Sequence, residues 1–194
     1  MLPTINTAIE NIIKHLISNH DHALSRDAKI TTRLVTKSKT IKSRLHQLFR
    51  HLPTETIEHG TTYIYAVDYL HKIANATHAL AVESSEYALN QHPDLNPEQQ
   101  EELYILQENL CQIINEVTKM ISSNHYATLS IVHTSLEDII IHIDDIKNRQ
   151  LRRIKQQELG VRNTTLYLNI ILEIKNIAIY LQKITKHGSH LEEE

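Results

Sequence analysis

The sequence has very few of the residues that interrupt a helix. Its 194 residues include only three glycines, which stand apart from one another, and four prolines. Long stretches therefore contain no helix breaker, and a glycine-rich loop of the kind that binds phosphate is excluded. Tryptophan is absent and aromatic residues make up 5% of the chain, so isoleucine and leucine supply most of the apolar mass. This composition predicts an all-α protein.

Cysteine is nearly absent as well, since Cys111 is the only one. No internal disulfide can form, so the fold does not require an oxidising compartment. A lone cysteine inside an apolar stripe is more often a buried, inert thiol than a nucleophile. The sequence also lacks an apolar run of about 18 residues and an apolar segment after Met1, so we expect neither a membrane span nor a signal peptide. These absences favour a soluble, cytosolic chain.

Apolar residues recur every three or four positions in six segments, which predicts six helices. Asn96 marks the start of the fourth, because its side chain can cap a first turn opened by Pro97 and Glu98. Gly160 is expected in a left-handed cap at the end of the fifth helix. The stretch between Pro53 and Gly60 is expected to be irregular. The predicted ranges are 4–19, 21–52, 61–90, 97–124, 129–160 and 164–186.

The apolar stripes favour antiparallel helices joined by short connections, and two three-helix bundles side by side fit the count. We expect one helical domain over residues 1–186 and a flexible tail over 187–194. The sixth helix has two apolar faces, so it is either a central helix or one that docks on a missing partner. The second helix has its expected stripe at Ile30, Leu34, Ile41, Leu45, Leu48 and Leu52.

Charge is segregated along the chain, although the net charge is only -3. Residues 26–50 hold eight basic side chains and one acid, residues 55–116 hold eleven acids and one lysine, and residues 147–162 are basic again. Helices of opposite charge could compensate one another within the fold, since exposed pairs contribute about 0 to 1 kcal/mol each. Alternatively, a basic surface could face anionic lipid headgroups or phosphate. The candidates for that surface are Arg149, Arg152, Arg153, Lys155 and Arg162.

The residues that catalysis or metal binding requires are not spaced as those functions need. Despite fourteen histidines, the sequence has no Glu-x-x-His, His-Glu-x-x-His, histidine pair four apart or Gly-x-Ser-x-Gly. We expect no enzyme activity, no metal and no cofactor, and a sequence pI of about 6.5 without aromatics among the lysines argues against nucleic acid. Some polar groups do stand at helical separation, and we interpret them as solvated or pH-sensitive surface pairs. They are Asp68 with His71 and Asn75, His133 with Glu137, and Asp138 with His142.

Two segments resemble a known family. Residues 63–70 read Tyr-Ile-Tyr-Ala-Val-Asp-Tyr-Leu and lie within residues 58–78. Residues 149–181 contain Gln-Leu-Arg-Arg-Ile-Lys and, further on, Leu-Gly-Val-Arg-Asn-Thr-Thr-Leu-Tyr-Leu-Asn-Ile. Both segments are similar to the cytosolic C-terminal region of bacterial sodium/phosphate cotransporters, a region of the PhoU-like group.

The resemblance implies two packed three-helix bundles that regulate sodium-dependent phosphate transport without performing it. The implied location is the inner face of the cell membrane, and the implied partners are the transmembrane part of the same transporter or another protein. An anionic membrane surface and a second copy of the chain are further partners in this interpretation. The alternative is a free-standing PhoU-type regulator of phosphate uptake that binds metal or a signalling partner.

Stand-alone PhoU proteins bind metal clusters through a Glu-x-x-x-Asp motif in each bundle. In this sequence the nearest positions of the first motif are His71 and Asn75, and those of the second are Glu173 and Ile177. Because isoleucine cannot coordinate a cation, the resemblance does not carry the metal function over to this chain.

Overall fold

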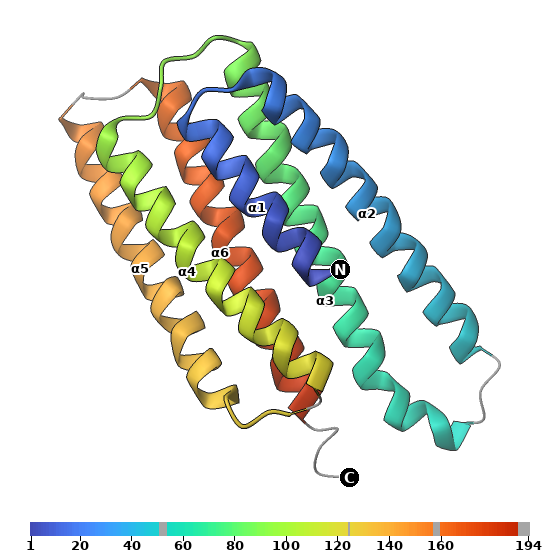
Figure 1. Cartoon of the computed structure of the whole chain (residues 1–194). Helices are drawn as coiled ribbons and strands as arrows, with labels where there is room; N and C mark the ends of the chain where they lie inside the picture. Colours follow the sequence, from blue (N-terminus) through green and yellow to red (C-terminus); the bar gives the residue numbers. More distant parts are fainter. Residues whose placement is uncertain (51–53, 124, 157–159, 190–194) are drawn as a thin grey trace.

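A computed structural model describes residues 1–50, 54–123, 125–156 and 160–189, with the backbone alone described at 54–59 and 187–189. Over these residues the chain forms six helices and no strand, which confirms the all-α prediction (Figure 1). None of the helices, within the part described, is long and apolar enough to cross a membrane. The helices are α1 (Leu2–Ile17), α2 (Asp21–Phe49), α3 (Thr54–Leu89), α4 (Pro97–Ser123), α5 (Leu129–Lys155) and α6 (Val161–Ser189).

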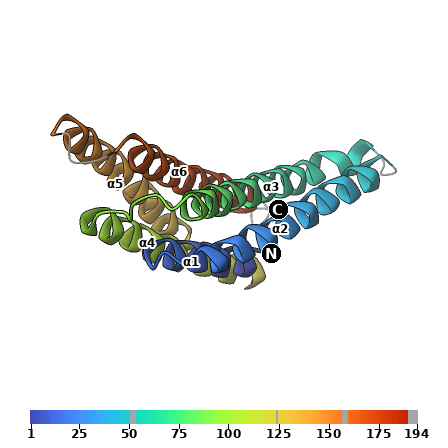
Figure 2. The ribbon, with the colours of Figure 1, turned by 90° about the horizontal axis from the view of Figure 1, so that it is seen from above.

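The helices form two three-helix bundles, as predicted. Helices α1, α2 and α3 pack on one another, and so do α4, α5 and α6. The bundles meet where α3 packs along α6 and α1 packs along α4, so Figure 2 shows these pairs on opposite faces of the molecule. Helices α2 and α5 are the outermost, because each contacts only helices of its own bundle in the described part of the chain.

The predicted apolar stripes of the second bundle form its core. On α4, every predicted stripe residue from Leu103 to Met120 is buried, and α5 buries its own stripe from Val132 to Ile146. Helix α6 packs against α3, α4 and α5, so it is the central helix of the two alternatives left open by its double apolar face. Within that second face Ile171 and Ala178 are fully buried, whereas Leu172 is half exposed.

The stretch from Pro53 to Gly60 corrects one prediction. Helix α3 begins at Thr54, so residues 54–60 are helical rather than irregular. Gly60 is buried within this helix, and a Cβ added there would lie 1.8 Å from Cε1 of Phe49 on α2. The glycine therefore permits close approach of two helices instead of breaking one.

The end of α5 corrects a second prediction. The helix ends at Lys155, where Gln156 closes it in a right-handed conformation, and Gly160 does not have a positive φ. Its carbonyl instead accepts a hydrogen bond from the Thr164 amide in the first turn of α6. Helix α6 then continues to Ser189, three residues past its predicted end, and residues 190–194 of the expected tail lie outside the described part.

The first bundle is only partly covered by its own first helix. Helices α2 and α3 continue past the start of α1 as a two-helix projection, which we call the arm and define as residues 39–49 and 61–70 (Figure 1). No residue of the arm is buried. The predicted apolar stripe of the second helix is therefore buried at Leu34, which is 6% exposed, and exposed at Leu48, which is 56% exposed.

Candidate functional site

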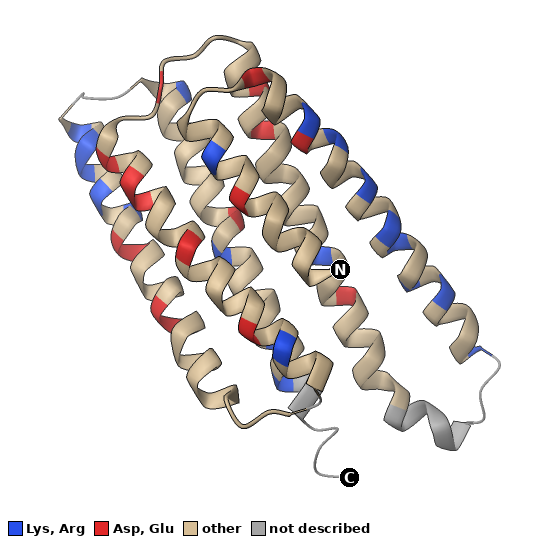
Figure 3. Cartoon of the chain, viewed as in Figure 1, with Lys and Arg blue, Asp and Glu red and all other residues tan. Residues whose placement is uncertain are grey.

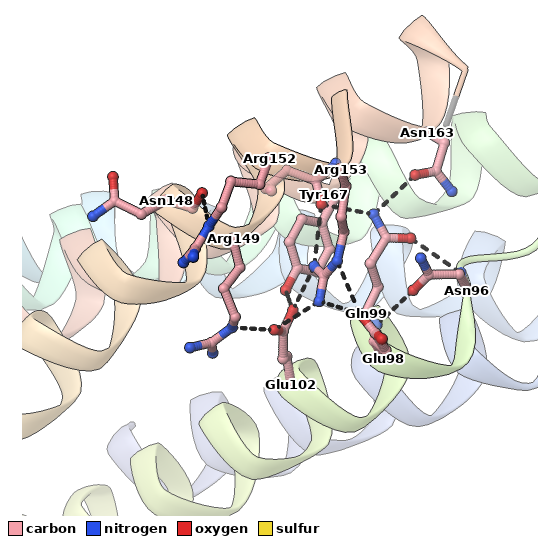
Figure 4. Close-up of polar contacts among 11 residues, drawn as sticks. Asn96, Glu98, Gln99, Glu102, Asn148, Arg149, Arg152, Arg153, Asn163 and Tyr167 are labelled. Atoms are coloured by element: carbon pink, nitrogen blue, oxygen red, sulfur yellow. Dashed lines mark hydrogen bonds and ion pairs between the residues drawn. The ribbon is translucent and has the colours of Figure 1, made fainter. Parts of the chain in front are cut away.

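The predicted basic surface lies where α5 ends and α6 begins, and the structure divides its residues. Arg152, Lys155 and Arg162 are exposed, and Arg149 is partly exposed. Arg153 is buried, with a side chain only 7% exposed, which excludes it from a surface that meets anions. The sequence prediction is wrong at that residue because Arg153 points back into the bundle toward carboxylates on α4 (Figure 4).

Arg153 forms a forked contact with Glu102. Its Nη1 and Nη2 donate to Oε2 and Oε1 of Glu102 at 2.9 Å each, and Nη2 and Nε also donate to Oε2 of Glu98 at 2.8 and 3.1 Å. A guanidinium suits this role because its planar donors match a carboxylate in two places at once. The contact joins the last turns of α5 to the first turns of α4.

Glu102 accepts further hydrogen bonds from both sides. Arg149 Nε donates to its Oε1 at 2.7 Å, and the hydroxyl of Tyr167, a fully buried residue of α6, donates to its Oε2. Burial alone would raise the pKa of Glu102, but the hydrogen bonds from Arg153, Tyr167 and Arg149 outweigh it and lower that pKa. The carboxylate is therefore held ionised in a buried place.

The pKa values of two partners of Glu102 shift in the direction that their hydrogen bonds to this carboxylate favour. The hydrogen bond to Glu102 is the main reason that the pKa of Arg153 rises, against the opposing effect of burial. Burial, followed by the hydrogen bond to Glu102, raises the pKa of Tyr167. These shifts keep Arg153 charged and Tyr167 neutral, and the hydrogen bonds of both residues to Glu102 join α5 and α6 to α4.

An amide network continues the cluster toward the end of the bundle. Asn96 and Gln99 cap the start of α4 reciprocally, since the Gln99 amide donates to Asn96 Oδ1 at 2.8 Å and the Asn96 amide donates to Gln99 Oε1 at 3.0 Å. The side-chain amide of Gln99 then donates to Gln150 on α5 and Asn163 on α6, at 3.2 and 2.9 Å. The predicted Asn96 cap is confirmed, whereas the buried role of Gln99 follows only from the packing of three helices.

The exposed cations have different surroundings. Arg152 Nε donates to the backbone carbonyl of Asn148 at 3.4 Å, and its side chain faces solvent. Arg162 instead lines an open pocket of about 300 Å³ together with Glu83 and Glu86 of α3. The pKa of Glu83 is raised by burial first and then by the neighbouring carboxylates of Glu173 and Glu86. Arg162 therefore borders acids of α3, while its side chain remains exposed at the start of α6.

The polar pairs noted in the sequence mostly find other partners. Asp68 pairs with Lys42 and Lys72, not with His71. His71 Nδ1 lies 2.8 Å from Ser38 Oγ, and its Nε2 lies 3.2 Å from the side-chain amide nitrogen of Asn75. In the second bundle, His133 meets Thr185 of α6 at 2.8 Å, and Asp138 and His142 line a shallow pocket on α4 and α5.

The same contacts reveal a polar seam in the first bundle that the sequence analysis missed. Along α2, buried Asp27, Thr31 and Ser38 stand where a helix of this kind normally places apolar residues. Each meets a histidine: Asp27 meets His15 at 2.7 Å, Thr31 meets His78 at 3.0 Å and Ser38 meets His71. The signal was present as polar residues spaced four and seven apart, which fit one helix face.

The positions related to the PhoU metal motifs do not form a metal site. Ile177 is fully buried, Glu173 accepts a hydrogen bond from Asn176 at 3.2 Å, and His71 is engaged in the polar seam. Within the residues described, no three side chains of histidine, cysteine, aspartate or glutamate gather as metal ligands would. Cys111 is buried, and burial raises the pKa of its thiol.

Two three-helix bundles that pack together through α3 with α6 and α1 with α4 give a protein of PhoU-like fold, as predicted. The structure is similar to that of PhoU from Pseudomonas aeruginosa, with a TM-score of 0.85 at 8% identity, covering 100% of this chain and 92% of that one. It is also similar to that of the phosphate transport system regulatory protein PhoU from Streptococcus pneumoniae, with a TM-score of 0.79 at 13% identity, covering 98% and 90%. No family model matches the sequence, and no curated protein matches it.

Proposed function

We propose that this chain is a regulatory module that modulates phosphate transport rather than performing it. The supporting observation is the likeness of its whole length to PhoU structures, one of which is named as a phosphate transport system regulatory protein. The polar groups gathered at the end of the second bundle support the same proposal, because they bind one another and join helices instead of surrounding a substrate.

In its finer form, the proposal places the chain in the cytosolic part of a sodium-dependent phosphate transporter. The two segments that resemble the cotransporter C-terminal region support this form. The alternative is a free-standing regulator of phosphate uptake. Reading the gene on both sides distinguishes them, because transmembrane segments in the same reading frame support the transporter domain and a separate gene supports the regulator.

The test of a regulatory role is phosphate uptake in cells. The region encoding this chain is deleted, and uptake of radiolabelled phosphate is measured at low and high external phosphate, with restoration by the wild-type chain as the control. We expect uptake to persist but to lose its response to external phosphate. Complete loss of uptake would contradict modulation, and unchanged uptake with an unchanged response would contradict any regulatory role.

We further propose that the exposed cations at the junction of α5 and α6 meet an anionic membrane surface. Arg152, Lys155 and Arg162 support this proposal by their exposure, and each cation near such a surface contributes about 1 kcal/mol. Replacing all three with glutamine is expected to weaken binding to phosphatidylglycerol vesicles at low salt. The matched control replaces three exposed lysines elsewhere, Lys39, Lys119 and Lys183. Equal losses in both variants would identify the patch as ordinary solvated surface.

A further inference from the structure

An open pocket lies on the face of the molecule where α3 packs along α6. Its volume of about 330 Å³ is within the range of about 300 to 1,000 Å³ that small-molecule sites have. Two of its lining residues, Ala76 and Ala79 of α3, have small side chains and leave space between larger neighbours. All the lining residues stand three or four apart, on one face of each helix. The larger ones are Lys72 and Asn75 of α3 and Glu173, Asn176 and Tyr180 of α6.

The two ends of this pocket differ in charge. Glu173 lies at one end, and beyond it the same two helices form the pocket that holds Glu83 and Glu86. At the other end, Nζ of Lys72 lies 5.8 Å from the ring centre of Tyr180. Figure 3 shows this arrangement on α3, whose one lysine lies near the middle of the helix and whose last turns carry two acidic residues. A ligand with an anionic group at one end is therefore held in one direction.

The basic end of the pocket has more ammonium groups than carboxylates. Asp68 pairs with Lys72 at 3.0 Å and also with Lys42 of α2. A third ammonium group comes from Lys183 of α6, whose Nζ lies 6.0 Å from the ring centre of Tyr69, while Nζ of Lys72 lies 4.8 Å from the same centre. Two lysines thus share one carboxylate and a third lysine lies beside them, so this end attracts an anion such as a phosphate group.

Two tyrosine rings lie next to these lysines. The rings of Tyr69 and Tyr180 are stacked, with centres 6.1 Å apart and planes inclined by 26°. Tyr180 also lines the pocket. Aromatic side chains of this kind bind the flat face of a nucleobase. The pocket therefore offers a stacking surface for a planar ring beside a site for its phosphate.

The acidic end of the pocket distinguishes one base from another. The side-chain amide of Asn176 donates to Oε2 of Glu173 at 3.2 Å, which holds the carboxylate in place. An ionised carboxylate only accepts hydrogen bonds, whereas the amide groups of Asn75 and Asn176 also donate them. Guanine presents two adjacent N–H donors next to its carbonyl O6, whereas adenine presents one donor next to an unprotonated ring nitrogen. A carboxylate flanked by two amides therefore matches guanine better than adenine.

We propose that this pocket binds a guanine nucleotide. The carboxylate of Glu173 accepts hydrogen bonds from the two N–H donors of the base, and the base packs against Tyr180. The phosphates lie at the ammonium groups of Lys72 and Lys183, because at the opposite end they would meet carboxylates. The proposal goes beyond the modulation of phosphate transport and does not depend on it.

Three ligands test the two ends of the pocket separately. Isothermal titration calorimetry measures the binding of guanosine diphosphate (GDP), adenosine diphosphate (ADP) and guanosine to the full chain. We expect GDP to bind at least tenfold more tightly than ADP, because ADP leaves the carboxylate facing an acceptor. We also expect GDP to bind at least tenfold more tightly than guanosine at low salt, with a difference that shrinks as salt rises.

One substitution tests how the base is recognised. Glu173→Gln exchanges one acceptor oxygen for an amide donor, so we expect it to weaken GDP binding at least tenfold and to leave ADP binding within twofold of wild type. The matched control is Glu116→Gln on α4, which makes the same change in net charge outside the pocket and should leave GDP binding within twofold. Circular dichroism confirms that each variant retains its helices.

A double substitution tests how the phosphates are bound. Lys72→Gln with Lys183→Gln is expected to weaken GDP binding at least tenfold and to leave guanosine binding within twofold, since guanosine carries no phosphate. Asp68 keeps Lys42 as a partner in this variant. The matched control is Lys119→Gln with Lys147→Gln, which removes two exposed lysines from α4 and α5. Tyr180→Leu should weaken GDP and guanosine alike, because both stack their base on the ring.

Each contrary outcome overturns the proposal. Absence of GDP binding at millimolar concentration would show that the pocket holds no nucleotide. Equal affinities for GDP and ADP would show that the carboxylate does not read the base. Equal losses in Glu173→Gln and Glu116→Gln, or in the two lysine variants, would show unspecific attraction only. Displacement of GDP by inorganic phosphate, with no binding of guanosine, would reduce the site to its lysines.

Discussion

In the second bundle the helices pack along one another and a buried ion pair joins them at one end. In the first bundle the arm is not buried, and the polar seam joins α2 to α1 and α3. Isoleucine and leucine fill the stripes of α4 and α5, and the ion pair of Arg153 with Glu102 joins their ends. On α2 the equivalent inward positions include Asp27, Thr31 and Ser38, which meet histidines. The comparison shows that two bundles with the same order of helices can differ in how much apolar surface they bury and in how many polar side chains they place inside.

We expect the largest effect on the free energy of unfolding from the buried ion pair at the end of the second bundle. Replacing Arg153 with methionine leaves the Glu102 carboxylate buried without its main partner, which typically costs about 3 to 5 kcal/mol. Urea denaturation followed by circular dichroism measures this loss in the free energy of unfolding. The double variant Arg153→Met, Glu102→Leu should recover much of it, because no buried charge remains.

A neighbouring arginine provides the control for this prediction. Arg152→Met removes a cation from the same helix end. Because the side chain of Arg152 faces solvent, the free energy of unfolding should change by no more than about 0.5 kcal/mol. If the two single variants were equally stable, the buried ion pair would not be what fastens the second bundle.

One substitution in each bundle tests whether apolar side chains of the arm are less buried than those of the second bundle. Leu136 on α5 is 0% exposed, and Leu136→Ala should cost about 2 to 5 kcal/mol through lost burial and a cavity. Leu45 lies on the uncovered arm, and Leu45→Ala should cost about 1 kcal/mol or less because little surface is removed from water. Thermal and urea unfolding of both variants gives the comparison. Equal losses would mean that the arm is as tightly packed as the second bundle.

The sequence was sufficient for the architecture but not for the site. Regular stripes such as Leu103 to Met120 indicate a helix and its buried face together, so the helix count and the two bundles could be predicted. Whether Arg153 faces solvent or Glu102 depends on how α4 and α5 are rotated against each other, which the pattern of a single helix does not encode. The position of Gly60 shows the same limit, because its fit against Phe49 arises only once α2 and α3 are packed.

The starts of helices in the two bundles also differ. Asn96 and Gln99 cap α4 reciprocally, whereas His20 precedes α2 without a side-chain cap. Asn96→Ala should therefore cost about 1 kcal/mol, since it removes an acceptor for an amide of the first turn. Urea denaturation measures the loss, and Asn96→Ser is the control that should restore most of it. An unchanged midpoint for Asn96→Ala would show that Gln99 alone is enough to hold the end of the bundle.

The smallest effect is expected from two histidines, one in each bundle. Burial lowers the pKa of His71, and nearby Lys42 lowers it further while Asp68 opposes this; burial is also the main cause that lowers the pKa of His133. The unfolded chain, with histidine pKa values near 6.5, then binds more protons than the folded chain, so stability falls as pH drops below that value and is retained above it.

Unfolding free energies between pH 5.5 and 7.5 measure this dependence, in a window above the titration of Glu102. His71→Gln and His133→Gln should each reduce the slope of stability against pH by a fraction of the roughly 1.4 kcal/mol per pH unit that one whole proton gives, since both side chains are partly exposed. The two reductions should add, because the histidines lie in separate bundles. An unchanged slope in the double variant would remove both histidines as the source, and a reduction for His71→Gln alone would confine the pH dependence to the polar seam of the first bundle.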